Sequence, residues 1–342
     1  MIINTITLII LSIVSTSIII KFRGLIAKKL GLIDLPNEKR KIHKLPTPLV
    51  GGVIIFTNLI LINIYLVSID EMTTLNIFIF IFCFISFIIG LIDDVKKISS
   101  TNKLIIIGLI YICIGSFEEN FFLKYLYSDS LNKFIYLNVF NAMFSALCIL
   151  LLINAFNLID GLNFLAIKIA LIWLIYIFIF FENINYSFLI IILSLILMAP
   201  FNYKGKFFLG DSGSILIGSF IGIIFITSYN LEMDLETNKI SIENIFILFM
   251  MPGLDMFRLF VERIYNKTNP FSADNKHLHH YLIKKFNLNK TLIIYSLLII
   301  SPILIEYFDI IDPSINILIG CSVYLIIIFY LKKITFYKNL KK

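Results

Sequence analysis

The sequence has little charge for its length. Only 15% of its 342 residues are Asp, Glu, Lys or Arg, and 59% are hydrophobic, whereas soluble domains average about 25% charged and about 45–50% apolar residues. Cysteine is also scarce. The four cysteines all fall inside apolar runs and form no C-x-x-C pair, so disulfides and thiolate metal sites are not expected. These shortages exclude an ordinary soluble domain and indicate a polytopic membrane protein.

Common targeting and cofactor signals are missing as well. The first apolar run lacks a basic n-region and an A-x-A-type cleavage site, so we expect a retained helix rather than a cleaved signal. The sequence contains no H-E-x-x-H, Walker loop or dinucleotide fingerprint, and no repeat marks two homologous halves. Any chemistry must therefore come from other motifs.

The sequence does contain many long apolar runs. At roughly 20 residues per span, they predict about eleven transmembrane helices. We therefore expect an all-α polytopic integral membrane protein, with a single transmembrane catalytic domain over residues 1–342. The runs lie near residues 2–20, 49–67, 75–92, 104–117, 139–156, 164–181, 188–200, 215–229, 242–260, 292–308 and 314–331.

Positive charge is divided unevenly between the two sets of loops. One set, together with the C-terminal tail, holds nearly all of the 29 lysines and arginines, and the other holds only Lys124, Lys133 and Lys239. The positive-inside rule then places the N-terminus outside and the C-terminus in the cytoplasm. The net charge of +7 therefore reflects membrane topology rather than nucleic-acid binding. The predicted cytoplasmic loops span about 21–48, 93–103, 157–163, 201–214 and 261–290.

The first cytoplasmic loop contains the ordered pattern Asp34-x-Pro-Asn-x5-His-x4-Pro. Its prolines rule out a regular helix, and Gly51-Gly52 allow close backbone approach at the start of the second span. His43 and Lys44 are candidate substrate contacts. The alternative is a basic anchor for anionic lipid headgroups.

Two adjacent carboxylates, Asp93 and Asp94, end the third apolar run. An ionised aspartate at the bilayer centre costs about 2.5–3.5 kcal/mol on insertion scales, so the pair must lie at the boundary, in a wet cavity or beside a cation. Lys97 follows closely. The pair is a candidate catalytic or metal-binding centre, and the alternative is a solvated, salt-bridged loop worth under about 1 kcal/mol.

A polar stripe ends the fifth run, in the segment NAFNLIDGLN. Asn154, Asn157 and Asp160 are spaced three apart, so they share one helix face. These residue types suit neither lipid nor a helix interior. The stripe must therefore face protein, ligand or water, with a hydrogen-bonding seam between helices as the alternative.

A glycine-serine turn, Gly210-Asp211-Ser212-Gly213-Ser214, immediately precedes the eighth run. The free N–H groups and partial positive charge of a helix start favour a phosphate, and Asp211 could hold the metal of that phosphate. Gly210 and Ser212 are therefore candidate substrate contacts, although a lone motif of this kind is often a capped loop.

The ninth run carries Asp255 and Arg258 three apart on one face, where they could simply pair with each other. The following loop contains His277, His279 and His280. His277 and His280 could share a helix face, with His279 pointing elsewhere. Since no cysteine completes a tetrahedron, donation to phosphate or sugar hydroxyls is favoured over a zinc site.

These inner-face groups are the parts of Mg2+-assisted phosphoryl chemistry, in which positioning and charge neutralisation supply most of the catalysis. A site at the membrane surface would join a water-soluble phosphate compound to a lipid-anchored one. A transporter or flippase is the competing class, but transporters place ionisable residues near the midplane and often show repeated halves. A membrane scaffold would leave the Asn/Asp stripe unexplained.

Five ordered segments resemble the polyprenyl-phosphate N-acetylhexosamine-1-phosphate transferase family. They are DLPNEKRKIHKLPTPLVGG, GLIDDVKK, NAFNLIDGLN, FLGDSGS and ADNKHLHHYL. The resemblance implies transfer of a sugar-1-phosphate from a UDP-N-acetylhexosamine to undecaprenyl phosphate, with release of UMP. It also implies Mg2+, with Mn2+ as an alternative, and a site facing the cytoplasm in the inner (cytoplasmic) membrane. No nucleic-acid partner is expected, and a homodimer is left open.

The resemblance further implies residue roles. Asp211 is expected to bind the metal, and Asp93, Asp94 and Asp160 are expected to be catalytic, with the acidic pair handling the lipid phosphate. Substrate contacts are expected from Lys44, His43, Lys97, Asn154, Asn157, Gly210, Ser212, His277, His279 and His280.

The branch of the family is indicated by fewer residues. The first loop and the H-x-H-H segment resemble the branch that uses UDP-GlcNAc to initiate cell-envelope polysaccharides such as O-antigen. Leu278 stands where the muramoyl-pentapeptide branch has a triple-histidine run. Asn163 and Asn275 depart from the usual residues, so another UDP-N-acetylhexosamine and UDP-muramoyl-pentapeptide stay open. We expect a single displacement, with a covalent aspartyl-phosphate as its rival.

Overall fold

The structure, a computed structural model, describes residues 2–36, 45–182, 184–235, 240–270 and 274–340. Helices make up 77% of it, so the predicted all-α class is confirmed. Paired strands among these residues are limited to two small antiparallel hairpins. One joins β1 (Ile33–Asp34) to β2 (Thr47–Pro48), and the other joins β3 (Tyr125–Ser128) to β4 (Lys133–Tyr136).

Every predicted apolar run forms a helix. Within the described ranges, nine helices are long and apolar enough to cross a membrane. The other two, α5 (Ser100–Gly115) and α7 (Leu165–Phe180), are apolar but have only 16 residues each. Eleven crossings, and the side on which each terminus lies, therefore remain predictions. The nine longer helices are α1 (Ile2–Lys21), α3 (Gly51–Ser68), α4 (Thr74–Lys96), α6 (Asn141–Ile159), α8 (Leu189–Tyr203), α9 (Gly210–Leu235), α10 (Ile242–Tyr265), α12 (Leu288–Tyr307) and α13 (Pro313–Leu340).

The chain forms two compact units. The first contains Met1–Lys124 and Leu137–Asn238, and the second contains Tyr125–Tyr136 and Lys239–Lys342. The first unit thus holds α1 to α9, including the short α2 (Arg23–Leu30), and the second holds the β3–β4 hairpin and α10 to α13, including the short α11 (Leu278–Lys285). Short 3-10 turns occur at Glu119–Phe121, Asn138–Phe140 and Tyr186–Phe188. A single catalytic domain over the whole chain remains a prediction.

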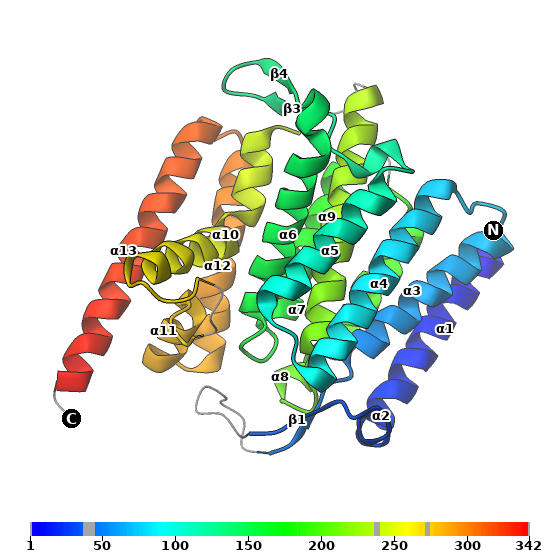
Figure 1. Ribbon diagram of the computed structural model, residues 1–342, viewed down its shortest axis with the longest axis horizontal. Coiled ribbons are helices and arrows are strands. Elements are labelled where there is room, and N and C mark those ends of the chain that lie inside the picture. Colours follow the sequence, from blue (N-terminus) through cyan, green and yellow to red (C-terminus); the bar gives the residue numbers. More distant parts are fainter. Residues whose placement is uncertain (1, 37–44, 183, 236–239, 271–273, 341–342) are drawn as a thin grey trace. The chain divides into compact units, whose positions relative to one another are not determined.

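Helix α9 is the core of the first unit. In its apolar window 94% of the residues are buried, and it packs against α3, α4 and α6 (Figure 1). Small residues in membrane helices allow close backbone approach. At Gly90 of α4, an added Cβ would lie 2.5 Å from the Cα of Ser212. Only glycine therefore lets the end of α4 approach the first turn of α9.

The start of α3 is joined to the segment before α9 by backbone hydrogen bonds. The N–H of Phe208 donates to the carbonyl of Pro48 (2.9 Å), and the N–H of Gly51 donates back to the carbonyl of Phe208 (3.1 Å). An added Cβ at Gly52 would lie 2.5 Å from the Ser212 Oγ. The expected close approach at Gly51-Gly52 is therefore confirmed, and two helices from distant parts of the sequence meet the start of α9.

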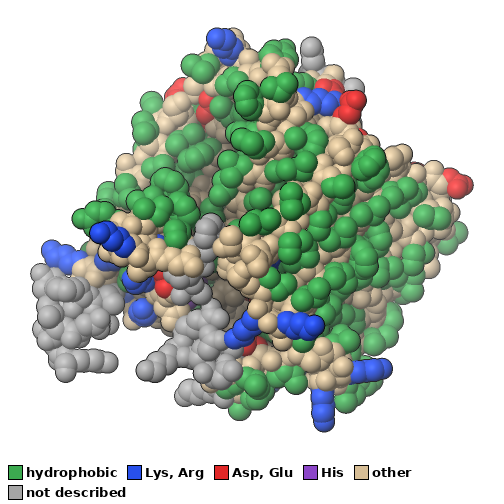
Figure 2. All heavy atoms as spheres, in the orientation of Figure 1, with side chains coloured by type: hydrophobic (Ala, Val, Ile, Leu, Met, Phe, Trp, Pro, Cys, Tyr) green, Lys and Arg blue, Asp and Glu red, His purple; other side chains and the backbone are tan. Residues whose placement is uncertain are grey.

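The helices of the first unit expose large apolar side chains. Ile64 on α3, Leu109 on α5 and Met143 on α6 are 60%, 65% and 71% exposed, and Figure 2 shows hydrophobic side chains over much of the visible helical surface. Soluble proteins rarely expose large contiguous apolar patches. The chain is therefore a multi-pass membrane protein.

In the second unit, α10 begins with a complete capping box. Ser241 accepts a hydrogen bond from the Asn244 N–H through its side chain, and the Asn244 side chain accepts one from the Ser241 N–H. Glu243, in the first turn, accepts hydrogen bonds from Ser128 Oγ (2.7 Å) and the Asp129 N–H (3.1 Å). This carboxylate therefore fixes the turn of the β3–β4 hairpin to the start of α10.

Candidate active site

Asp93 lies in the last turn of α4 and is only 6% exposed. One carboxylate oxygen accepts a hydrogen bond from the Ile98 N–H (2.7 Å), and the other accepts one from Lys103 Nζ (2.6 Å). Lys103 belongs to α5 and is itself 8% exposed. Because buried charges are tolerated when they are paired and hydrogen-bonded, the turn between α4 and α5 is held by this ion pair.

Asp94 has different surroundings, since it caps α9. Its two carboxylate oxygens accept hydrogen bonds from the N–H groups of Asp211 (2.7 Å) and Ser212 (3.0 Å). A carboxylate at a helix N-terminus satisfies orphan donors and interacts favourably with the helix dipole. Gly210 has a φ of +73°, and a Cβ there would lie 2.7 Å from Asp94 Oδ2, so glycine is required.

This cap corrects one part of the sequence analysis. The Gly-Ser motif does not precede the helix but forms its first turn, since α9 begins at Gly210. The N–H groups of Asp211 and Ser212 are not free for a phosphate, because Asp94 already accepts their hydrogen bonds. Gly210 and Ser212 as substrate contacts remain predictions.

The Asp211 side chain on α9 lies next to side chains from two other helices, α6 and α5. Its Oδ1 accepts a hydrogen bond from Asn157 Nδ2 on α6 and lies 3.5 Å from Lys103 Nζ on α5. Asn157 Nδ2 also donates to Ser214 Oγ (2.7 Å), one turn further along α9. The Asp211 side chain nevertheless remains 36% exposed, so it is oriented by neighbours and still open to a ligand.

Asp160 directly follows α6 and completes the acidic group. Burial raises the pKa of its carboxyl well above the usual value, and the negative charges of Asp211 and Asp94 raise it further. Asp94, Asp160 and Asp211 thus lie close enough for their charges to interact, while the buried Lys103 pairs with Asp93 and lies 3.5 Å from Asp211. A site with this excess of negative charge favours an additional cation.

The acidic residues fit Mg2+ only as part of a coordination shell completed by water and substrate. Among the described residues, no group of three or more His, Cys, Asp or Glu side chains could hold a metal by itself. Mg2+ is usually bound through one or two carboxylates together with waters and substrate phosphates, rather than by an all-protein cage. Asp211, a partly exposed carboxylate in an acidic cluster, fits that pattern. Dependence on Mg2+ remains a prediction.

Other predicted contacts of the first unit are placed as follows. Lys97 is exposed at the C-cap of α4, with a φ of +50°. Asn154 is half-buried one turn before Asn157 on α6. His43 and Lys44 lie outside the described residues. Their roles remain predictions.

Lys103 is the residue that the sequence analysis passed over. It is the third lysine after the acidic pair, whereas the family resemblance indicates Lys97 as the substrate contact. The available signal was a lysine at the start of an apolar helix, where a buried charge needs a partner. The turn between α4 and α5 then brings Lys103 back to Asp93.

The three histidines lie in the second unit, at the start of α11. Their rings gather together, with centroids 5.6 Å apart for His277 and His279 and 4.1 Å apart for His279 and His280. The expectation that His279 points elsewhere is therefore wrong. The reason is that His277 is the N-cap of α11 with extended backbone (φ −67°, ψ 155°), so helical spacing does not apply to it.

Two of these histidines are held neutral by burial. Burial, and then the charges of His280 and His277, lower the pKa of His279 well below its usual value. Burial, followed by the charges of His277 and Lys284, lowers the pKa of His280 to about 4. The His279 ring is 0% exposed, so contact with a substrate would require this segment to move.

The comparisons with known proteins support a sugar-phosphate transferase, in keeping with the acidic cluster at the helix ends of this multi-pass membrane protein. The sequence model of glycosyl transferase family 4 matches residues 76–229, which include all four carboxylates, Asn157 and Lys103. This match and the relatives described next support the polyprenyl-phosphate N-acetylglucosamine-1-phosphate transferase family, which the motifs predicted.

The curated relatives carry closely related names. An undecaprenyl-phosphate alpha-N-acetylglucosaminyl 1-phosphate transferase of Thermotoga maritima is 29% identical over 269 residues, which cover 78% of each chain. A probable undecaprenyl-phosphate N-acetylglucosaminyl 1-phosphate transferase of Bacillus subtilis is 27% identical, covering 80% of this chain and 76% of the relative. The Escherichia coli K12 enzyme, named like the first, is 26% identical, covering 79% and 74%.

Proposed function

We propose that this protein transfers N-acetylglucosamine-1-phosphate from UDP-GlcNAc to undecaprenyl phosphate and releases UMP. The family match and the names of the relatives support this reaction. The observation that carries it is the arrangement around Asp211, whose side chain is oriented by Asn157 and Lys103 while Asp94 fixes its backbone. Such fixed, charged groups are suited to stabilising phosphoryl transfer.

The reaction is a single displacement. A phosphate oxygen of the lipid forms a bond to the β-phosphorus of UDP-GlcNAc, the bond from that phosphorus to the bridging oxygen breaks, and UMP leaves with the electron pair. Asp211 would hold Mg2+, which supplies charge neutralisation for the pyrophosphate when it is bound. Lys103 lies close enough to Asp211 to neutralise the same developing charge.

Asp93 orients the acceptor rather than removing its proton. Both of its oxygens already accept hydrogen bonds, from the Ile98 N–H and Lys103. A phosphate monoester has its second pKa near about 6, so the lipid phosphate is mostly deprotonated at neutral pH. The role of the Asp93–Lys103 pair is therefore to place the nucleophile.

The proposed setting is the cytoplasmic (inner) membrane, with the site facing the cytoplasm and the reaction initiating a cell-envelope polysaccharide. Asp93, Asp160 and Asp211 lie at the ends of α4, α6 and α9 rather than in their middles. A carrier would place its ionisable groups near the bilayer midplane. Another UDP-N-acetylhexosamine as donor is the second candidate, since Asn163 and Asn275 leave the sugar open.

UMP release by the purified protein tests this function. The protein is mixed with undecaprenyl phosphate and Mg2+, and UDP-GlcNAc, UDP-GalNAc and UDP-muramoyl-pentapeptide are compared as donors. We expect release with UDP-GlcNAc. Asp211→Asn should lower kcat by roughly 10²–10³-fold, the usual cost of losing one oriented charge-stabilising group.

Asp234→Asn is the matched control, because it makes the same change at the opposite end of α9, where Asp234 pairs with Lys124 (2.9 Å). It should leave Mg2+-dependent release within about twofold, as expected for an exposed ion pair. Full activity of Asp211→Asn would remove Asp211 from the proposed site. UMP exchange into UDP-GlcNAc without lipid phosphate would instead favour the covalent route.

A further inference from the structure

A cavity in the first unit is bordered by α1, α2 and α8. It has a volume of about 260 Å³ and is lined by Ser17, Ile20, Lys21, Arg23, Leu197 and Phe201. All of these residues belong to the first unit, in which α1 packs against α8. Since about 15 Å³ is enough to hold one water, the cavity has room for part of a much larger molecule.

The two walls of the cavity differ in chemistry because of their sequences. Ser17 and Lys21 are four apart and share one face of α1, and Arg23 follows at the start of α2. Leu197 and Phe201 are four apart on α8, and the Phe201 side chain is left 39% exposed. The cavity therefore has a basic wall facing an apolar one.

Neither cation of the cavity has a carboxylate partner within the described residues. Arg23 donates to two backbone carbonyls, those of Ile20 (2.9 Å) and Lys206 (3.3 Å). The Lys21 ammonium lies over the ring of Phe22, 5.5 Å from its centroid. An anion in the cavity would therefore meet two positive charges that no described side chain neutralises.

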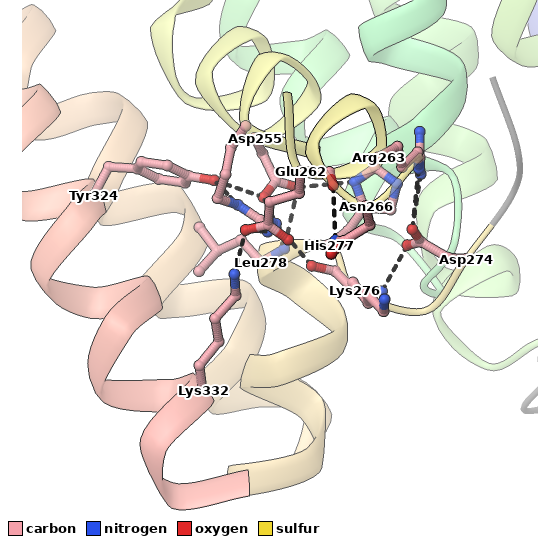
Figure 3. Close-up of polar contacts among 11 residues, drawn as sticks. Asp255, Glu262, Arg263, Asn266, Asp274, Lys276, His277, Leu278, Tyr324 and Lys332 are labelled. Atoms are coloured by element: carbon pink, nitrogen blue, oxygen red, sulfur yellow. Dashed lines mark hydrogen bonds and ion pairs between the residues drawn. The ribbon is translucent and has the colours of Figure 1, made fainter. Parts of the chain in front are cut away.

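The other two arginines of the described chain are neutralised by carboxylates. Arg258 pairs with Asp255 (2.8 Å), so the ion pair that the sequence allowed is confirmed. Arg263 pairs with Asp274 (3.0 Å; Figure 3). A guanidinium offers five N–H donors in a fork that matches carboxylate or phosphate. Arg23 bonds its two carbonyls through Nε and Nη1, so the N–H groups of Nη2 are left for an external acceptor.

The cavity lies at the same helix ends as the acidic cluster. Helix α8 ends at Tyr203 and α9 begins at Gly210, and the carbonyl of Lys206, which Arg23 contacts, belongs to the segment between them. The ends of membrane-spanning helices lie near the lipid headgroups. Lysine and arginine at that level attract anionic lipids, while their apolar stems pack along the hydrocarbon.

We propose that this cavity binds an anionic phospholipid of the surrounding leaflet. The headgroup phosphate lies at Lys21 and Arg23, and the first part of an acyl chain lies against Leu197 and Phe201. Two positive charges favour a lipid of net negative charge over a zwitterionic one. The site includes none of the residues assigned to sugar-phosphate transfer, so it goes beyond the proposed function and does not rest on it.

Fluorescence quenching tests this site in the purified full-length protein. Trp173 is the only native tryptophan and is 0% exposed, so the parent chain gives the background, and Phe201→Trp adds an indole to the cavity wall. Phosphatidylglycerol brominated in its acyl chains is titrated into this variant in detergent, and phosphatidylcholine brominated in the same way is the zwitterionic comparison. We expect saturable quenching, with phosphatidylglycerol binding at least about tenfold more tightly.

Removal of both cations should weaken this binding. In the Phe201→Trp background, Lys21→Gln with Arg23→Gln should raise the apparent dissociation constant for phosphatidylglycerol by roughly 10- to 30-fold. Lys28→Gln with Lys29→Gln is the matched control, since it removes the same charge from exposed positions of α2 outside the cavity. It should change the constant by less than about threefold, because charges in water are screened.

Three results would each overturn the proposal. They are equal affinity for the two brominated lipids, equal weakening by the two double variants, and reversal of the quenching by undecaprenyl phosphate at lower concentration than by unbrominated phosphatidylglycerol. The last would assign the cavity to the lipid substrate.

Salt provides a test that needs no charge variant, should Lys21→Gln with Arg23→Gln not fold. Binding of phosphatidylglycerol to Phe201→Trp should weaken as NaCl rises from about 0.05 M to about 0.5 M, because salt screens partly exposed charges. Binding that does not change with salt would overturn the proposal as well.

Discussion

Asp93 and Asp94 are neighbours in the sequence, but their side chains do different things. Asp93 forms a nearly buried ion pair with Lys103. Both carboxylate oxygens of Asp94 accept hydrogen bonds from N–H groups in the first turn of α9. Asp94 therefore positions Asp211 through the backbone, while Asp93 and Lys103 form a neutral pair beside it. Of the acidic pair, Asp93 is the one placed to act on a phosphate together with a cation.

The structure places Lys103 beside Asp93, whereas the sequence predicts Lys97 as the substrate contact. Replacing each lysine in turn tests which of the two the reaction needs. Lys103→Met should lower kcat by at least about 100-fold, since it removes a charge beside Asp211. It should also lower the melting temperature, because a buried Asp93 without its partner costs about 3–5 kcal/mol. Lys97→Met changes an exposed side chain and should have a smaller effect on both.

Both variants are measured by UMP release and thermal unfolding, with Lys103→Arg as the charge-conserving control. The site would need revision if Lys97→Met lost as much activity as Lys103→Met while keeping its melting temperature.

At the scale of elements, the helices were predictable and the start of α9 was not. Apolar runs identify helices because the bilayer interior requires internally bonded backbone, and the polar stripe was expected to face protein or ligand, as Asn157 does. The apolar run, however, begins at residue 215, whereas α9 begins at Gly210. Its cap comes from Asp94, 117 residues away in the sequence from Asp211. Such a long-range partner leaves no local signal.

The same limit applies to α11. The i, i+3 spacing predicted a shared face for His277 and His280, but the Asp255 carboxylate on α10 holds His277 outside the helix. Sequence spacing describes residues within one helix. It does not show that a side chain of a neighbouring helix, here Asp255, forms a hydrogen bond with the N-cap residue.

Helix α11 should make the protein sensitive to acid. The folded-state pKa of His280 is about 4, below the value of 6.5 expected in the unfolded chain. Between these values the unfolded chain binds more protons, so stability is lost as the pH falls from about 6.5 towards 4. Thermal unfolding of purified protein from pH 7.5 to pH 4.5 measures this loss.

His280→Gln should unfold with a shallower pH dependence than wild type over that window, with little difference above pH 7. Part of the slope should remain, because the pKa of His279 is also lowered by burial. Identical slopes for the two proteins would mean that His280 does not contribute to the acid sensitivity.

At the scale of the whole molecule, the number of membrane crossings depends on the two shorter apolar helices, α5 and α7. Helix α5 has 16 residues, about 24 Å at 1.5 Å per residue, whereas the hydrocarbon core is about 30 Å thick. A short helix can still cross by local thinning of the bilayer or by snorkelling of flanking residues. The positive-inside pattern requires this crossing, since it places the acidic pair of α4 and the loop after α5 on opposite sides.

Labelling at the two ends of α5 decides whether it crosses. In a variant with all four native cysteines replaced, Thr101→Cys in the first turn of α5 and Ser116→Cys directly after α5 each introduce a single thiol at an exposed position. With the N-terminus outside, a membrane-impermeant maleimide should label the Ser116→Cys variant in intact cells. It should label the Thr101→Cys variant only after permeabilisation. Equal labelling of both would show that α5 does not cross, and the reverse pattern would place the acidic cluster outside and exclude a cytoplasmic UDP-sugar as its substrate.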